Sequence, residues 1–103
     1  MSNSRAPLFK AMLGHAFGLA GERAKGLSIL EEMKVLSKQL YASPFDFAII
    51  HTGLGDREMT FHWLETAYSE RVMRIQELNE PHFDSLRGDP RFEDLLRRIG
   101  IPR

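Results

Sequence analysis

The sequence predicts an all-α fold built from helical hairpins. Apolar residues recur at intervals of three and four residues along most of the chain, which is the period of helices with one buried face. Twice an apolar run ends at a glycine, Gly21 or Gly55, which an acidic residue and a second amphipathic run follow at once. Glycine readily takes the left-handed conformation that ends a helix. The two glycines lie 34 residues apart, so the same hairpin occurs twice.

Composition limits the classes of protein to consider. A chain of 103 residues supports one domain, 1–103. The absence of cysteine excludes disulfides and thiolate metal sites, and the formal net charge of zero gives no support to nucleic-acid or anionic-membrane binding. No run reaches the roughly 18 apolar residues that span a bilayer. We therefore predict a cytoplasmic protein without a membrane or nucleic-acid partner.

The first hairpin begins at Pro7, which suits the first position of a helix. The apolar residues of 8–20 cover more than one face, so we expect this helix to be covered on two sides. Gly21 ends it, and a second amphipathic helix runs from Glu22 to about Leu40. Gly26 interrupts the second helix, which indicates a close helix crossing there.

The second hairpin has the clearer start signals. Ser43 is placed as a helix cap before Pro44, and the run to Leu54 is apolar nearly all round. We expect this helix to be the most buried element. Asp56 can accept hydrogen bonds from the free N–H groups of the next helix, which ends near Glu70.

The tail contains shorter elements. A weakly amphipathic piece, 71–80, predicts a short third helix that Pro81 closes, and a single helical turn follows at 83–86. A final helix starts at the cap Asp89 and stops at Gly100. Four apolar residues should cover the open face of the second hairpin, which makes the tail a cap: Phe83, Leu86, Phe92 and Leu95.

A repeat pattern runs through both hairpins. In the first it falls on Leu13, Gly14, Phe17, Gly21, Gly26, Leu30 and Met33, and in the second on Phe47, Ala48, His51, Gly55, Thr60, Leu64 and Ala67. With its period of 34 residues, this pattern resembles the tetratricopeptide repeat (TPR). The second copy departs from the pattern at His51, in an aromatic position, and at Thr60, in an alanine position. The resemblance implies repeats at 7–40 and 41–74 and a capping tail at 75–103.

The family resemblance also implies a function. The phrases GLGDREMTFHWLETAYSER and FDSLRGDPRFEDLLRRIGIP are similar to the C-terminal end of TPR arrays in bacterial multidomain regulators. Such arrays bind proteins or assemble with themselves, without catalysis or cofactors. We therefore predict a non-enzymatic interaction or self-assembly module. The alternative is a C-terminal regulatory segment of a bacterial signalling or transcription-regulating protein.

The resemblance places a concave groove on the first helix of each pair. Its residues would be Ala11, Met12, His15, Leu19, Phe45, Asp46, Ile49 and Thr52. A protein or peptide partner can lie in such a groove. The chain's own tail, or a second subunit, can fill it instead, and the sequence leaves these alternatives open.

The first hairpin has no repeat before it, although apolar residues lie where a preceding repeat would pack. We predict that this self-association face, formed by Leu8, Phe9, Ala16 and Ala20, is covered in a homo-oligomer, most simply a dimer. Opposite charge assists weakly, because residues 1–40 carry +3 and residues 41–80 carry −4.

The remaining polar residues suggest no chemistry. The four histidines are not spaced as metal ligands, so we predict neither a metal site nor a catalytic site. We expect His51 to be a hydrogen-bonded interior residue and His62 to point outward. Trp63 is interpreted as a partly exposed packing residue rather than a partner anchor. The arginines of the last helix alternate with acidic residues, which is typical of a solvated face.

Overall fold

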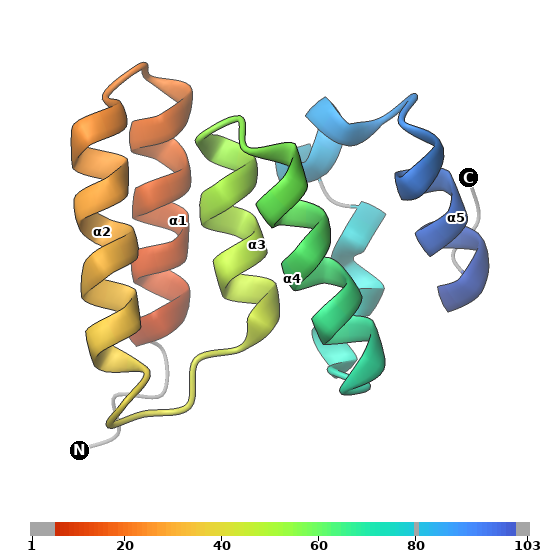
Figure 1. The fold of residues 1–103 in the computed structure, drawn as a ribbon, viewed down its shortest axis with the longest axis horizontal. Helices are drawn as coiled ribbons and strands as arrows, with labels where there is room; N and C mark the ends of the chain where they lie inside the picture. The colour runs from red at the N-terminus through yellow and green to blue at the C-terminus, as the bar shows by residue number, and fades with distance from the viewer. Residues whose placement is uncertain (1–5, 80, 101–103) are drawn as a thin grey trace.

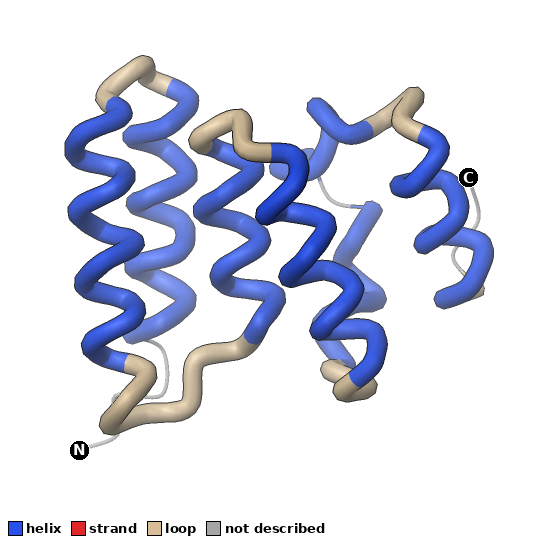
Figure 2. The backbone as a smooth tube through the Cα atoms, viewed as in Figure 1, coloured by secondary structure: helices blue, strands red, loops and turns tan. Residues whose placement is uncertain are grey.

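The computed structural model describes residues 6–79 and 81–100, and every regular element in these residues is a helix. Two antiparallel helix pairs stand side by side, and shorter helical turns and a last helix follow them (Figures 1 and 2). The all-α prediction is confirmed. Pro102, the far end of the predicted capping tail, lies outside the described residues. Within the described ranges, no helix is long and apolar enough to cross a membrane.

The first four helices form the two predicted hairpins. Helices α1 (Ala6–Leu19) and α2 (Arg23–Leu36) pack against each other, as do α3 (Pro44–Gly53) and α4 (Arg57–Ser69). The hairpins join through α1 and α3, which lie next to each other. Two sides of α1 are therefore covered, one by α2 and one by α3.

The second helix ends earlier than the sequence predicts, at Leu36 instead of Leu40. The Ser37 hydroxyl donates a hydrogen bond to the carbonyl oxygen of Lys34 at 2.7 Å. Serine competes in this way with the regular backbone bonds of a helix. The backbone then tightens, since the Gln39 N–H donates to the Leu36 carbonyl three residues back.

Both hinge glycines have the left-handed backbone that the sequence predicts, with φ of +80° at Gly21 and +78° at Gly55. Side chains other than glycine are strained there, so these two positions fix where each hairpin turns. The second helices start differently. Asp56 accepts a hydrogen bond from the Met59 N–H at 3.2 Å, whereas Glu22 makes no side-chain cap.

Glycines also set how closely the helices approach. A side chain on Gly18 would overlap the carbonyl group of Gly53 on α3, and one on Gly53 would come within 2.6 Å of the His15 backbone. A side chain on Gly26 would lie 2.8 Å from Leu54 and 3.4 Å from the Gly14 carbonyl. The close crossing predicted at Gly26 is confirmed, and a still closer one joins α1 to α3.

Helix α3 is the centre of the core. It contacts α1, α4 and the tail, and all ten of its residues are buried. Its start is fixed as predicted, because the Ser43 hydroxyl accepts a hydrogen bond from the Phe45 N–H at 3.1 Å. An apolar helix covered on every side must be enclosed by other elements. The prediction that this is the most buried element is confirmed.

The tail comprises two 3₁₀ helices, η1 (Met73–Asn79) and η2 (Pro81–Leu86), and the α-helix α5 (Pro90–Ile99). The sequence did not specify the 3₁₀ form. The four apolar tail residues predicted to cover the second hairpin are at most 1% exposed: Phe83, Leu86, Phe92 and Leu95. They lie against α3, α4 and each other, so the tail caps the core.

The tail also repeats the layout of a hairpin. Gly88 has a left-handed φ of +92° and lies 33 residues after Gly55. Asp89 follows it and caps α5 by accepting the Arg91 N–H at 2.9 Å, as Asp56 caps α4. The two 3₁₀ helices take the place of the first helix, and the second of them begins at Pro81, which has no N–H to donate. The cap is thus a shortened third hairpin.

Candidate interaction surface

The exposed side of α1 is apolar along its whole length. Nine large hydrophobic residues are exposed in the part of the chain that the structure describes, and five belong to this helix: Leu8, Phe9, Met12, Leu13 and Leu19. Phe9 is 69% exposed and Leu19 is 70% exposed. The tail elements contribute none to this set. A contiguous apolar surface of this kind marks an interaction site.

The charged residues around this side of α1 do not interrupt it. Lys10 is the one charged residue between Ala6 and Leu19, and it turns towards α2, where it pairs with Glu32 at 2.8 Å. His15 points the other way, into the contact with α3. The exposed side of α1 therefore carries no charge of its own.

Four residues of this surface lie along one line of the helix. At 3.6 residues per turn, positions 9, 13, 16 and 20 share one side. The Ala20 N–H donates to the Ala16 carbonyl at 3.0 Å, so the helical path continues to Ala20. We call these residues, Phe9, Leu13, Ala16 and Ala20, the α1 ridge.

The second hairpin shows what normally covers such a ridge. The residues 34 positions later are all buried: Ser43, Phe47, Ile50 and Leu54. The first hairpin covers part of this set, since Ile50 faces Gly14 and Leu54 faces Gly26. Two of the four ridge positions thus correspond to residues that contact a neighbouring hairpin, whereas Phe47 stacks on Trp63 of its own hairpin.

The predicted self-association residues and the ridge largely coincide. Leu8, Phe9, Ala16 and Ala20 are all exposed, and three of them belong to the ridge. Leu8 lies beside the ridge, on the same side of α1 as Met12 and Leu19. Leu13 was assigned to the repeat pattern alone. Its four-residue spacing from Phe9 was the signal that could have placed it on this face.

The predicted groove is closed over most of its length. Of its eight residues, six are buried: Ala11, His15, Phe45, Asp46, Ile49 and Thr52. Met12 and Leu19 remain exposed. A partner can therefore reach only the α1 edge of the groove in this structure.

Two contacts account for this closure. Nδ1 of His15 lies 3.0 Å from the Ile49 carbonyl oxygen, in the close contact between α1 and α3. The tail covers the other part, where the Phe83 ring meets Phe45 edge-on at 5.3 Å. Of the alternatives that the sequence left open, the chain's own tail fills the α3 part of the groove.

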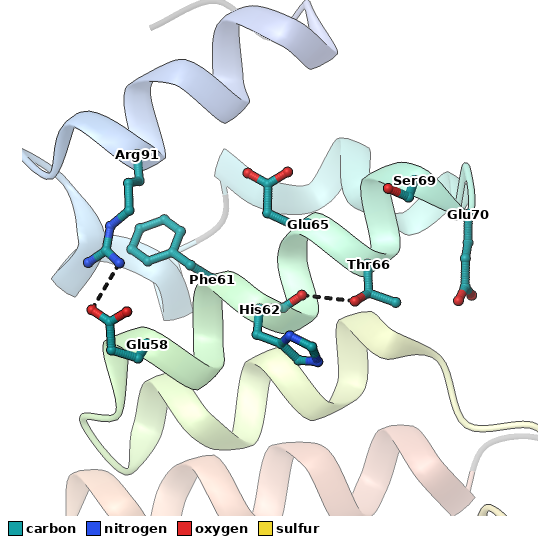
Figure 3. Close-up of a pocket in the computed structure, with 8 residues that line it drawn as sticks. All are labelled: Glu58, Phe61, His62, Glu65, Thr66, Ser69, Glu70 and Arg91. Carbon is teal, nitrogen blue, oxygen red and sulfur yellow. Dashed lines mark hydrogen bonds and ion pairs between the residues drawn. The ribbon is translucent and has the colours of Figure 1, made fainter.

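A second hollow, about 490 Å³ in volume, lies between α4 and α5 (Figure 3). Arg91 reaches from α5 to Glu58 at 3.0 Å and lies over the Phe61 ring at 4.3 Å. Hydrogen bonds to Asp89 and Glu58 raise the pKa of Arg91, so it stays charged. An ion pair and a cation–π contact thus join α5 to α4 across this hollow.

The same pairing recurs two helical turns further along. Arg98 contacts Glu65 at 3.0 Å and lies over the Tyr68 ring at 5.0 Å. Its hydrogen bonds to Glu65 raise the pKa of Arg98 as well. The alternating charges of the last helix predict a solvated face, whereas Arg91 and Arg98 also bind α4. The signal for this pairing is the shared seven-residue spacing of the arginines, the glutamates and the two aromatic rings.

His51 is buried as predicted. Its Nδ1 has no hydrogen-bond partner within the described residues, and Oδ2 of Asp56 lies 3.9 Å from it. Burial lowers the pKa of His51 against the opposing effect of Asp56. The interior position is therefore confirmed, and Nδ1 does not make the hydrogen bond that was expected of this residue.

The other aromatic predictions are confirmed. His62 is exposed on α4, and Trp63 is partly buried and stacks on Phe47 at 4.6 Å. Among the described residues, no group of three or more His, Asp or Glu side chains is arranged to hold a metal ion.

A scan against protein-family models and searches of curated proteins and of solved structures found no match.

Proposed function

We propose that this chain is a protein-interaction module of TPR-like hairpins, and that it acts by burying the exposed side of α1 against a protein partner. The observation that carries the proposal is the uncharged apolar side of α1. Residues of this kind supply most of the binding free energy when they are removed from water. The proposed role is binding without chemistry, in the cytoplasm.

The repeat geometry supports the same surface. Two positions equivalent to the α1 ridge, Ile50 and Leu54, are buried in the second hairpin against the first hairpin. The proposed binding surface is therefore the exposed side of α1 and no longer the groove, since the tail already covers the α3 part of the groove.

One substitution tests the proposal. Leu13→Glu places a charge in the middle of the ridge at a position that is 47% exposed, so the fold should tolerate it. The wild-type chain and the variant, each tagged, are compared for the proteins they retain, including untagged copies of the same chain. Val35→Glu, on the exposed side of α2, is the matched control. The expected result is a loss of binding in Leu13→Glu alone; equal binding by all three chains would overturn the proposal.

The same observation also favours the alternative function. In a C-terminal regulatory segment of a bacterial signalling or transcription-regulating protein, a preceding hairpin of the parent chain would cover the ridge. This alternative predicts that a longer chain, which includes the hairpin that precedes α1 in the parent protein, no longer binds the partner. The missing binding would be the same binding that Leu13→Glu removes from the shorter chain.

A further inference from the structure

We infer that the partner of the α1 ridge is a second copy of this chain, bound with its own α1 antiparallel about a two-fold axis. This inference rests on the proposed function, because it names the occupant of the same surface.

The order of side chains along the ridge carries the inference. The two residues nearer the start of α1, Phe9 and Leu13, are large, and the two nearer its end, Ala16 and Ala20, are small. When two identical helices lie antiparallel, the first half of each faces the second half of the other. With the axis midway between positions 13 and 16, Phe9 meets Ala20 of the second copy and Leu13 meets Ala16. Each large side chain then has a small one opposite, which allows helices to pack closely.

The same axis accounts for both pairs at once. Phe9 and Ala20 lie on either side of one midpoint, and Leu13 and Ala16 lie on either side of the same midpoint. A parallel arrangement would set Phe9 against Phe9 and leave alanine against alanine. The ridge is therefore complementary to itself in one direction only.

Charge permits the contact. In a two-fold interface identical residues meet near the axis, so a charge there would face its own copy. Lys10, the one charged residue of α1, turns away from the ridge and is neutralised by Glu32. Two α1 ridges can thus meet without like-charge repulsion.

The opposite end of the array does not offer the same fit. Its outer residues on α5 include Arg97 and Arg98, which pair with Asp94 and Glu65. A hollow of about 280 Å³ near Val72 and Ile99 has Arg71 on its wall. A head-to-tail contact would have to seat the uncharged ridge beside Arg71 and Arg98, which line this hollow. The uncharged ridge of a second copy is the better cover.

The size of the contact sets the strength expected. A helix of 14 residues is about 21 Å long, so the interface is at the small end for stable complexes. We therefore expect association in the micromolar range. Sedimentation from about 1 to about 500 µM should move the mass from the 11.8 kDa of one chain to twice that value.

Cysteine cross-linking tests the register, since the chain has no cysteine of its own. Chains carrying Phe9→Cys are mixed with chains carrying Ala20→Cys under mild oxidation. The expected product is a disulfide-linked dimer in the mixture and none from either chain alone. In this register the two copies of position 9 lie eleven residues apart along the helices, about 16 Å, too far for a disulfide. Val35→Cys mixed with Ala20→Cys is the control and should stay unlinked.

The outcomes separate the inference from the proposed function. A mass that stays at one chain with no cross-link, dimers of Phe9→Cys with itself, or species that grow beyond two chains would each overturn the two-fold register. If Leu13→Glu still loses binding to some other protein in those cases, the proposed function stands without the inference. If Leu13→Glu binds as well as the wild-type chain, both the proposed function and the two-fold dimer are overturned. Circular dichroism of each variant checks that its helices are intact.

Discussion

Helices α1 and α3 occupy the same place in their hairpins, yet their surroundings differ. All ten residues of α3 are buried, whereas α1 buries four: Pro7, Ala11, Gly14 and His15. Both sequences are apolar on several sides. The difference comes from their neighbours, because α3 has a hairpin before it and a tail after it, and α1 has a hairpin after it. The neighbours of each helix thus decide its burial, so that α3 lies in the core and α1 keeps an exposed side although the two sequences are similar.

The largest effect should come from truncating one phenylalanine on each of these two helices. Phe45 on α3 is fully buried, while Phe9 on α1 is 69% exposed. Phe45→Ala should lower the free energy of unfolding by about 3–5 kcal/mol, because it leaves a cavity. Phe9→Ala should change it by less than about 0.5 kcal/mol. Urea denaturation of both, in a monomeric Leu13→Glu background, measures the difference, and equal losses would contradict the burial described here.

An intermediate effect should follow from adding a side chain where α1 and α3 approach most closely. Gly18→Ala puts a methyl group into the Gly53 carbonyl, which is backbone and cannot turn aside. We expect a loss of about 1–3 kcal/mol, since the two helices must move apart. Gly14→Ala is the matched control. Its methyl group would meet side-chain atoms of Ile29 and Ile50 at 3.1–3.3 Å, which calls for a much smaller shift than the overlap with the Gly53 backbone, so its cost should be smaller. Thermal denaturation compares the stabilities of the two variants. Equal losses would contradict the close contact between Gly18 and Gly53.

The smallest effect concerns pH. His51 on α3 takes the repeat position of Phe17 on α1, and burial lowers its pKa below the ordinary 6.5. The unfolded chain therefore binds a proton at a higher pH than the folded chain does. The free energy of unfolding should therefore keep its full value above about pH 6.5. Below that pH, protonation of His51 in the unfolded chain lowers it, by at most about 1.4 kcal/mol per pH unit for one proton.

His51→Phe gives this position the residue type that Phe17 has in the first hairpin. The free energy of unfolding of this variant should change less with pH below about pH 6.5. Urea denaturation between about pH 5 and 8 measures it. His62→Phe is the control, because that histidine is exposed on α4. If the free energy of unfolding of His51→Phe still falls with pH as in the wild-type chain, another group takes up the proton.

The sequence predicted the helices well wherever a local signal fixes them. The left-handed Gly55 and the caps Ser43, Asp56 and Asp89 each act within a few residues, so their effect can be read from neighbouring letters. The end of α2 was missed because Ser37 can either continue a helix or bond back to it. Its choice depends on the loop that follows.

The closure of the groove was left open by the sequence, because it is a tertiary contact. The apolar residues of the tail predicted that Phe83 covers the second hairpin, but no local signal indicated that it would meet Phe45 of the groove. The third hairpin was hidden for a related reason. Pro81 breaks the helical pattern, and only the Gly88 hinge with its Asp89 cap keeps the repeat. The exposed ridge could be predicted because its apolar residues lie where a preceding repeat would pack.

The neighbour-to-neighbour layout has a consequence for folding. Several side-chain hydrogen bonds that join separate units link residues 28–34 positions apart, such as His15 with Ile49 and Glu65 with Arg98. No bond in this set joins the first hairpin to the tail. Contacts of such short span close quickly, and linear arrays of this kind grow by adding one unit to the next. Folding should therefore start at the middle hairpin and spread in both directions, so that α1 is among the last helices to settle and the first to open.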